Sequence, residues 1–174
     1  KAKNIIDMLI DTSIIYLSKQ IDAGADVIQI FESWSGLLDK DTYNDYIIEP
    51  NKKLRVIIKK KYPGVPMIFF PRNSAENTLK FVQEVKPDGL SIDLKTPQSV
   101  IEYCNEKDVV LQGRLDPFVL AEGGKKLQEE IYNTIKSIGK KEFIFNLSHG
   151  ILPHTPISNV EKTIRLIKEY ECSS

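Results

Sequence analysis

The sequence has few of the residues that usually build metal centres and disulfide frameworks. Among 174 residues there are two cysteines and two histidines. Cys104 and Cys172 lie far apart in the chain and form no Cys-x-x-Cys pair. The sequence therefore indicates neither a structural zinc site nor a disulfide framework, and its cysteine content suits a reducing cytosol.

Net charge and long apolar runs are also lacking. The 24 basic and 24 acidic side chains balance, so no global field attracts nucleic acid or an anionic membrane. No apolar run approaches the roughly 20 residues of a membrane helix. We therefore expect a cytoplasmic protein that binds neither nucleic acid nor membrane. The chain starts at Lys1 without a methionine, so any targeting signal would lie upstream.

Five short segments are rich in branched or aromatic residues, which predicts strands. The last of them shows no helical period and is predicted to be a buried strand. These segments are Asp26–Phe31, Val65–Phe70, Gly89–Asp93, Val109–Gly113 and Phe143–Leu147.

Segments with helical spacing and start signals separate the predicted strands. Helices are expected over about 5–21, over 41–61 with a new start at Pro50, over 73–85, after Thr96-Pro97, after Asp116-Pro117 and over 125–138. Asn73-x-x-Glu76 and Ser158-x-x-Glu161 have the pattern of capping boxes that open helices.

Alternation of strands and helices favours an α/β fold with a parallel sheet and right-handed crossovers. A complete eight-stranded barrel uses roughly 250 residues, so a chain of 174 residues holds five to six units. We interpret the chain as one partial (β/α)8 TIM-barrel domain. An independent five-stranded doubly wound domain is the structural alternative.

Two polar residues directly follow predicted strands. His149 lies just after the last strand, where Gly150 permits a sharp turn, and Ser33 lies just after the first. Parallel sheets place ligands at this end of their strands. The competing interpretations are a surface or packing histidine and a turn hydroxyl that satisfies the local backbone.

Three motifs in order resemble the uroporphyrinogen decarboxylase family. Gly24–Gly36 is similar to the family's central strand and loop, and Leu111–Pro117 is similar to its Gln-Gly-Asn-Leu-Asp-Pro segment. Phe143–Gly150, followed by Pro153-x-Thr-Pro156, resembles its carboxyl-terminal signature. Together the motifs extend over nearly the whole chain.

The resemblance implies the carboxyl-terminal five strand-helix units of the barrel, spanning 1–174, with the amino-terminal units missing. It also implies decarboxylation of the four acetate side chains of uroporphyrinogen III to give coproporphyrinogen III. The family uses no metal and no organic cofactor for this reaction. The resemblance further implies that the full-length protein is a homodimer and that it binds uroporphyrinogen as its small-molecule substrate.

The resemblance assigns substrate-binding roles to three residues. Ser33 and His149 match groups that contact substrate carboxylates, and Phe31 matches an apolar wall of the pocket, although a Phe in a strand is often simply core. The family's paired arginines, its ring-facing aspartate and a pocket tyrosine would lie upstream of Lys1. We therefore expect no catalytic residue within this chain and no activity of these residues alone.

Several positions depart from the family pattern. Arg114 stands in place of the usual asparagine, Leu94 of a frequent tryptophan, Ser148 of a glycine and Asn73 of a glycine. Arg72 occupies the place of a lysine.

Two further acidic residues follow predicted strands. Capping explains Asp116 best, whereas Asp93 has no assigned role.

Two other functions remain open. A corrinoid-linked methyltransferase shares this barrel but needs histidine and cysteine ligands for zinc, and the two cysteines are poorly placed for that. The remaining alternative is a non-enzymatic, truncated fragment.

Overall fold

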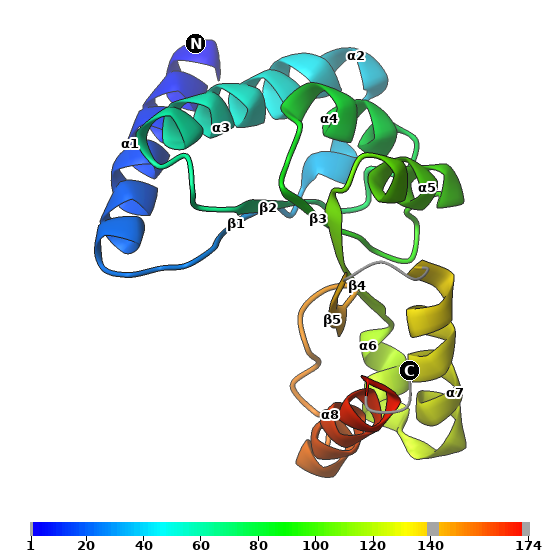
Figure 1. The fold of residues 1–174 in the computed structure, drawn as a ribbon. Coiled ribbons are helices and arrows are strands. Elements are labelled where there is room, and N and C mark those ends of the chain that lie inside the picture. The colour runs from blue at the N-terminus through cyan, green and yellow to red at the C-terminus, as the bar shows by residue number, and fades with distance from the viewer. Residues whose placement is uncertain (1, 139–142, 172–174) are drawn as a thin grey trace. The chain divides into compact units, whose positions relative to one another are not determined.

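The structure, a computed structural model, describes residues 2–138 and 143–171. Strands and helices alternate along these residues (Figure 1). The strands are β1 (Ile28–Glu32), β2 (Met67–Pro71), β3 (Gly89–Ser91), β4 (Val110–Leu115) and β5 (Phe143–Leu147). The helices are α1 (Ala2–Asp22), α2 (Lys40–Tyr43), α3 (Glu49–Lys61), α4 (Asn77–Val85), α5 (Gln98–Glu106), α6 (Pro117–Glu122), α7 (Gly124–Ile138) and α8 (Ile157–Glu171), with a 3₁₀ turn η1 (Ser35–Leu37) and a π-helical turn η2 (Asn44–Ile48).

The strands form one sheet in the order β1-β2-β3-β4-β5. β1 pairs with β2, β2 with β3, and β4 with β5, each in parallel. A doubly wound sheet reverses its strand order at a switch point, whereas barrel units add strands in sequence. The sequential order confirms the predicted parallel α/β fold built as part of a barrel, and the doubly wound alternative is wrong.

The chain divides into two compact units, and each is described by itself. The first comprises Lys1–Ser91 and Lys95–Val110, and the second comprises Ile92–Leu94 and Leu111–Ser174. No helix within the described residues is both long and apolar enough to cross a bilayer.

In the first unit, helices α1, α3, α4 and α5 lie on one side of strands β1 to β3 (Figure 1). Every residue of β2 is buried. Phe69 of β2 packs against Phe81 of α4, with ring centroids 6.0 Å apart. This apolar layer holds the strands against the helices.

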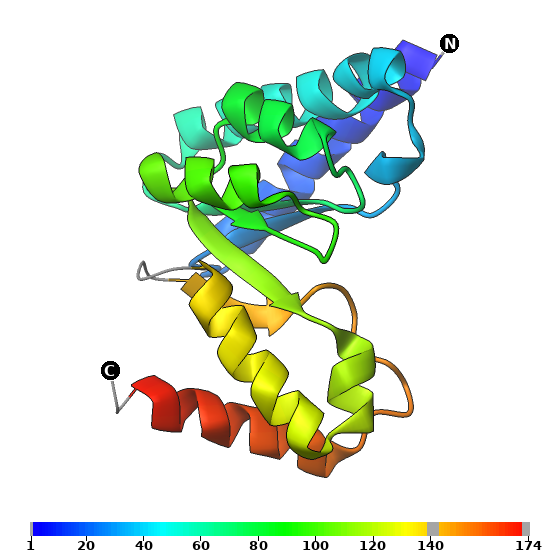
Figure 2. The same ribbon diagram turned by 90° about the vertical axis from the view of Figure 1, so that its right-hand side faces the viewer.

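The second unit has its own hydrophobic core, built by β4, β5 and helices α6 to α8 (Figure 2). Phe143, Phe145 and Leu147 of β5 pack against this core. Ile144 between them is 42% exposed. The prediction of a buried strand is therefore wrong for β5, whose exposure alternates with a period of two because helices cover only one of its faces.

Two predicted helix starts are wrong. Asn73 and Ala75 have φ of 58° and 41°, values in the left-handed region that an α-helix does not contain. α4 therefore begins at Asn77 and not at Asn73. α8 begins at Ile157, so Ser158 lies inside its first turn and does not precede it.

Two other start signals are confirmed. Asp116 is the N-cap of α6, and its Oδ1 accepts a hydrogen bond of 2.9 Å from the backbone N–H of Phe118. Pro50 lies in the first turn of α3, which follows the π-helical turn η2 directly. A proline in this position needs no N–H donor, so it marks the new start that the sequence predicts.

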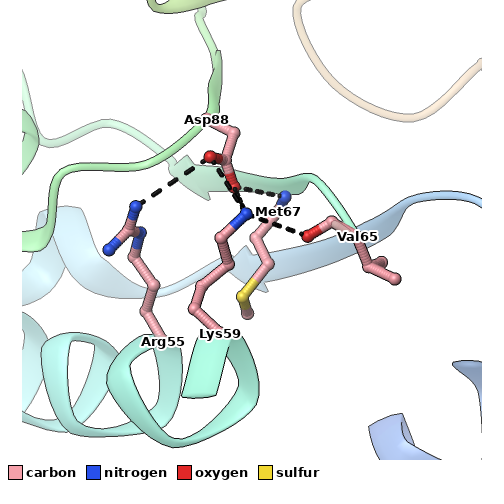
Figure 3. A network of polar contacts seen from close by, with 5 residues as sticks. All are labelled: Arg55, Lys59, Val65, Met67 and Asp88. Carbon is pink, nitrogen blue, oxygen red and sulfur yellow. Dashed lines mark hydrogen bonds and ion pairs between the residues drawn. The ribbon is translucent and has the colours of Figure 1, made fainter. Parts of the chain in front are cut away.

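A polar network around Asp88 joins α3 to the amino ends of β2 and β3 (Figure 3). Asp88 Oδ2 accepts from the backbone N–H of Met67 at 2.9 Å and lies 3.1 Å from Lys59 Nζ. Lys59 Nζ also donates to Val65 O at 3.2 Å, and Arg55 Nη2 lies 3.9 Å from Asp88 Oδ1. In barrels this end of the strands serves stability.

We expect Asp88→Ala to lower the free energy of unfolding by about 1–3 kcal/mol, because it leaves the Met67 N–H without its acceptor and the Lys59 ammonium without its carboxylate partner. Urea unfolding followed by circular dichroism measures the change. Asp7→Ala is the matched control, since it removes an exposed ion pair with Lys53 and should cost at most about 1 kcal/mol. Equal losses in the two variants would contradict a special role for the Asp88 network.

Candidate substrate-binding site

The loops that follow β1 and β2 are joined by buried hydroxyls. Ser35 Oγ lies 2.9 Å from Glu32 O and 2.9 Å from Arg72 O. Tyr43 O–H donates to Ser74 Oγ at 2.8 Å, and Ser74 Oγ donates to Ser35 Oγ at 3.0 Å. This hydroxyl chain, Tyr43-Ser74-Ser35, connects η1, the β2–α4 loop and the end of α2.

The two loops also approach each other closely at Gly36. Its N–H donates to Arg72 O at 3.1 Å. A Cβ at this position would lie 2.4 Å from Asn73 O and 2.6 Å from Asn73 Cβ. Only glycine fits between the loops without a shift of the backbone.

Burial perturbs the pKa of the Tyr43 phenol at the far end of the hydroxyl chain. Desolvation raises the pKa of Tyr43 to about 12, although its hydrogen bond with Ser74 acts in the opposite direction. The phenol therefore keeps its proton at neutral pH and remains the donor of the chain.

The structure brings Phe31, Ser33 and Arg72 together at the carboxyl ends of β1 and β2. The backbone N–H of Arg72 donates to Glu32 O at 3.2 Å, next to Ser33 in the chain. Phe31 is 62% exposed, and its ring meets that of Phe70 edge to face with centroids 6.4 Å apart. Ser33 and Arg72 are both half-buried.

Glu32 points toward the helical layer and thereby shows the direction of Phe31. Asn51 Nδ2 in α3 donates to Glu32 Oε1 at 2.8 Å. Burial raises the pKa of the Glu32 carboxyl above its ordinary value of 4.5, and the hydrogen bond from Asn51 offsets part of that rise. Because successive strand residues point to opposite faces, Phe31 lies on the face of β1 away from α3.

His149 lies in the second unit, directly after β5. The backbone N–H of the preceding Ser148 donates to Leu115 O at 2.8 Å, which fixes this loop to the end of β4. His149 is half-buried, and its Nδ1 lies 3.0 Å from Gly150 O. Since His149 and Ser33 belong to different units, a substrate site shared by the two stays a prediction.

A search of known families matches almost the whole chain. The family model described as uroporphyrinogen decarboxylase (URO-D) matches residues 1–170. The chain belongs to the uroporphyrinogen decarboxylase family. The fold and the three sequence motifs agree with this assignment.

Individual uroporphyrinogen decarboxylases are also similar to this chain in sequence. The uroporphyrinogen decarboxylase of Rickettsia bellii (strain RML369-C) is 39% identical over 170 residues, which cover 98% of this chain and 50% of the relative. That of Orientia tsutsugamushi (strain Ikeda) is 37% identical over 169 residues, covering 97% of this chain and 49% of the relative. The chain spans about half the length of the curated relatives it matches.

A solved structure shares the fold. A methyltransferase from Methanosarcina mazei superposes with a TM-score of 0.79 at 22% identity, covering 95% of this chain and 48% of that protein. At this identity the likeness concerns the fold alone.

The cysteine that the structure describes is poorly suited to bind zinc. Cys104 is buried in α5, and its burial raises the pKa of the thiol to about 12. A cysteine binds zinc as its thiolate. Cys172 lies outside the described residues. Within residues 2–138 and 143–171, no group of three His, Cys, Asp or Glu side chains is arranged to hold a metal ion.

Sequence reasoning found the loops of this family member but missed the contacts inside them. Ser35 and Ser74 follow β1 and β2 by three residues each, which is the only sequence signal that could have selected them. Nothing in the local sequence indicates that Asn51 donates to Glu32. Asp93, which had no assigned role, is buried at 7% exposure.

The raised pKa of Glu32 gives a pH prediction. Below 4.5 the carboxyl is protonated in both the folded and the unfolded chain, so it contributes no pH dependence. As the pH rises through the raised pKa, the folded state must bury a charge, and stability is lost. We expect Glu32→Gln to remove this loss while its amide oxygen still accepts from Asn51.

Urea unfolding between pH 4 and pH 8 measures this effect, and a ¹³C NMR titration gives the pKa of Glu32 directly. Glu76→Gln, at an exposed glutamate of the same unit, should leave the pH profile of the parent unchanged. A Glu32 pKa at or below 4.5 would contradict the prediction.

Proposed function

We propose that this chain contributes part of the active site of an enzyme that converts uroporphyrinogen III to coproporphyrinogen III in porphyrin biosynthesis. The observation that carries the proposal is the family match over residues 1–170. The geometry supports it, because polar and aromatic residues follow parallel strands at their carboxyl ends, where this class of sheet binds ligands.

The reaction replaces each acetate side chain by a methyl group. Protonation of the electron-rich pyrrole beside the carbon that bears the acetate creates a cation, and the cation accepts the electron pair when carbon dioxide leaves. A second proton then completes the methyl group, and loss of the ring proton restores the pyrrole. The protein must therefore hold several carboxylates and stabilise a cationic ring.

Three residues of this chain are proposed to hold the substrate. Ser33 Oγ and the His149 imidazole would donate to carboxylates, and Phe31 would form an apolar wall beside the ring. An N–H at Nδ1 of His149 would be held by Gly150 O, at 3.0 Å, which would direct Nε2 away from its own loop.

The methyltransferase alternative has less support. It rests on a likeness of fold at 22% identity, whereas the decarboxylase family matches by sequence. Cys104, with its raised pKa, is a poor source of the thiolate that zinc-dependent thiol activation requires.

We expect the 174 residues alone to form no coproporphyrinogen, because the groups that stabilise the cationic ring belong to the other half of the relatives. Each lost group of this kind costs about 10²- to 10³-fold in rate. A chimaera in which this chain replaces its matching segment in the Rickettsia bellii relative should be active. Anaerobic incubation with uroporphyrinogen III, followed by oxidation and chromatography of the porphyrins, measures both. Turnover by the chain alone at the rate of the intact relative would contradict this prediction, because it would place the catalytic groups within this chain.

In the active chimaera, Ser33→Ala and His149→Ala should each lower kcat/KM by roughly tenfold or more, since a hydrogen bond to a charged group contributes about 1.5–3 kcal/mol. The melting temperature should change little. His154→Ala and Ser99→Ala are matched controls, because both residues are exposed. Unchanged kinetic constants in Ser33→Ala and His149→Ala would remove both residues from the site.

A further inference from the structure

Arg114 carries a buried donor that the fold leaves unused. It is the penultimate residue of β4 and is half-buried. Its Nη1 is buried and has no hydrogen-bond partner among the described residues. Buried donors are normally paired, because an unpaired one loses its hydration without compensation. The folded chain thus holds a donor that lacks an acceptor.

The strand register shows which face of the sheet Arg114 occupies. Leu115 belongs to the core formed with helices α6 to α8, and Leu147 of β5 packs against that core. Arg114 pairs with Asn146, one residue before Leu147. Because neighbouring strand residues alternate between faces, Arg114 and Asn146 lie side by side on the face away from these helices.

The loop that carries His149 lies at the same end of the same two strands. The bond from Ser148 N–H to Leu115 O joins this loop to the residue that follows Arg114. The segments Val110–Leu115 and Phe143–Gly150 contain no acidic side chain. The nearest acid in sequence is Asp116, whose Oδ1 accepts from Phe118 N–H in the cap of α6.

We propose that Arg114 binds a carboxylate of the substrate, forming with His149 a second anionic subsite at the carboxyl ends of β4 and β5. A guanidinium offers paired N–H donors whose geometry matches a carboxylate. A shift of the half-buried guanidinium toward the bound carboxylate would give Nη1 the acceptor that it lacks. The identity of the ligand as a porphyrinogen rests on the proposed function above, whereas the carboxylate chemistry rests on Arg114 itself.

Arg114 stands where the family pattern has asparagine, and the two side chains differ in charge. An asparagine at this position offers one neutral amide, whereas Arg114 adds a positive charge and a longer reach. Its binding energy therefore depends on the negative charge of the ligand. The subsite should favour ligands with many carboxylates over those with few.

The test is calorimetric titration of the 174-residue chain with uroporphyrin III, which has eight carboxylates, and with coproporphyrin III, which has four. Benzene-1,2,4,5-tetracarboxylate serves as a probe without a pyrrole ring. Arg114→Gln should weaken uroporphyrin binding by about tenfold or more, and Arg114→Lys, which keeps the charge but not the paired donors, by less. Arg165→Gln is the matched control, because Arg165 lies exposed on α8 of the same unit.

Thermal unfolding separates binding from structure. If Arg114 had only a structural role, its replacement would lower the melting temperature. The apparent affinity would then fall because less of the chain is folded. Here Arg114→Gln should leave the melting temperature unchanged or higher, because it removes an unpaired buried donor.

The outcomes distinguish the subsite from the proposed function. Tight uroporphyrin binding that Arg114→Gln leaves unchanged would overturn the subsite and leave the proposed function standing. Arg114-dependent binding of the benzene tetracarboxylate without any binding of uroporphyrin would support the subsite and count against the proposed function. Binding of none of the three ligands would overturn the subsite, and the activity of the chimaera would then decide the proposed function by itself.

Discussion

The hydroxyl of Ser35 is the contact on which the geometry of the first unit's site depends. It lies against the backbone carbonyls of Glu32 and Arg72, the residues at the ends of two neighbouring strands. Ser74 and Tyr43 extend this contact into the buried interior. Because buried hydroxyls must stay paired, the two loops are held together as one structure. Ser33 lies between Glu32 and Ser35 in the chain and is placed by this contact, whereas Phe31 is also held by its own contact with Phe70.

The sequence predicted the elements of the fold better than their limits and contacts. β5 begins and ends where its residues indicate, since a Ser-His-Gly loop bounds it, whereas β1 starts at Ile28 because its pairing with Met67 begins there. That limit depends on a strand 39 positions away in the chain, which local pattern does not encode. The hydroxyl chain was equally out of reach, because Ser35 and Ser74 meet only after the parallel register of β1 and β2 is formed.

The pairing of charged side chains differs between the two ends of the strands. At the amino ends, Asp88 is surrounded by Lys59, Arg55 and the Met67 N–H, so its charge is matched within the fold. At the carboxyl end of β4, Arg114 Nη1 has no such match among the described residues. Stability favours the first arrangement, and binding favours the second, because a donor already satisfied by the protein has little to offer a ligand.

The position of Phe31 can be compared with the layers of side chains inside a barrel. It stands one residue before the end of β1, on the face away from α3, and is 62% exposed despite its contact with Phe70. In a closed barrel the inner layers are filled by side chains, and ligands bind beyond the last layer, at the carboxyl ends. A residue next to that end borders both regions. An aromatic ring exposed in this position gains from burial against an apolar surface that covers it, because its edge-to-face contact with Phe70 leaves most of the side chain open to water.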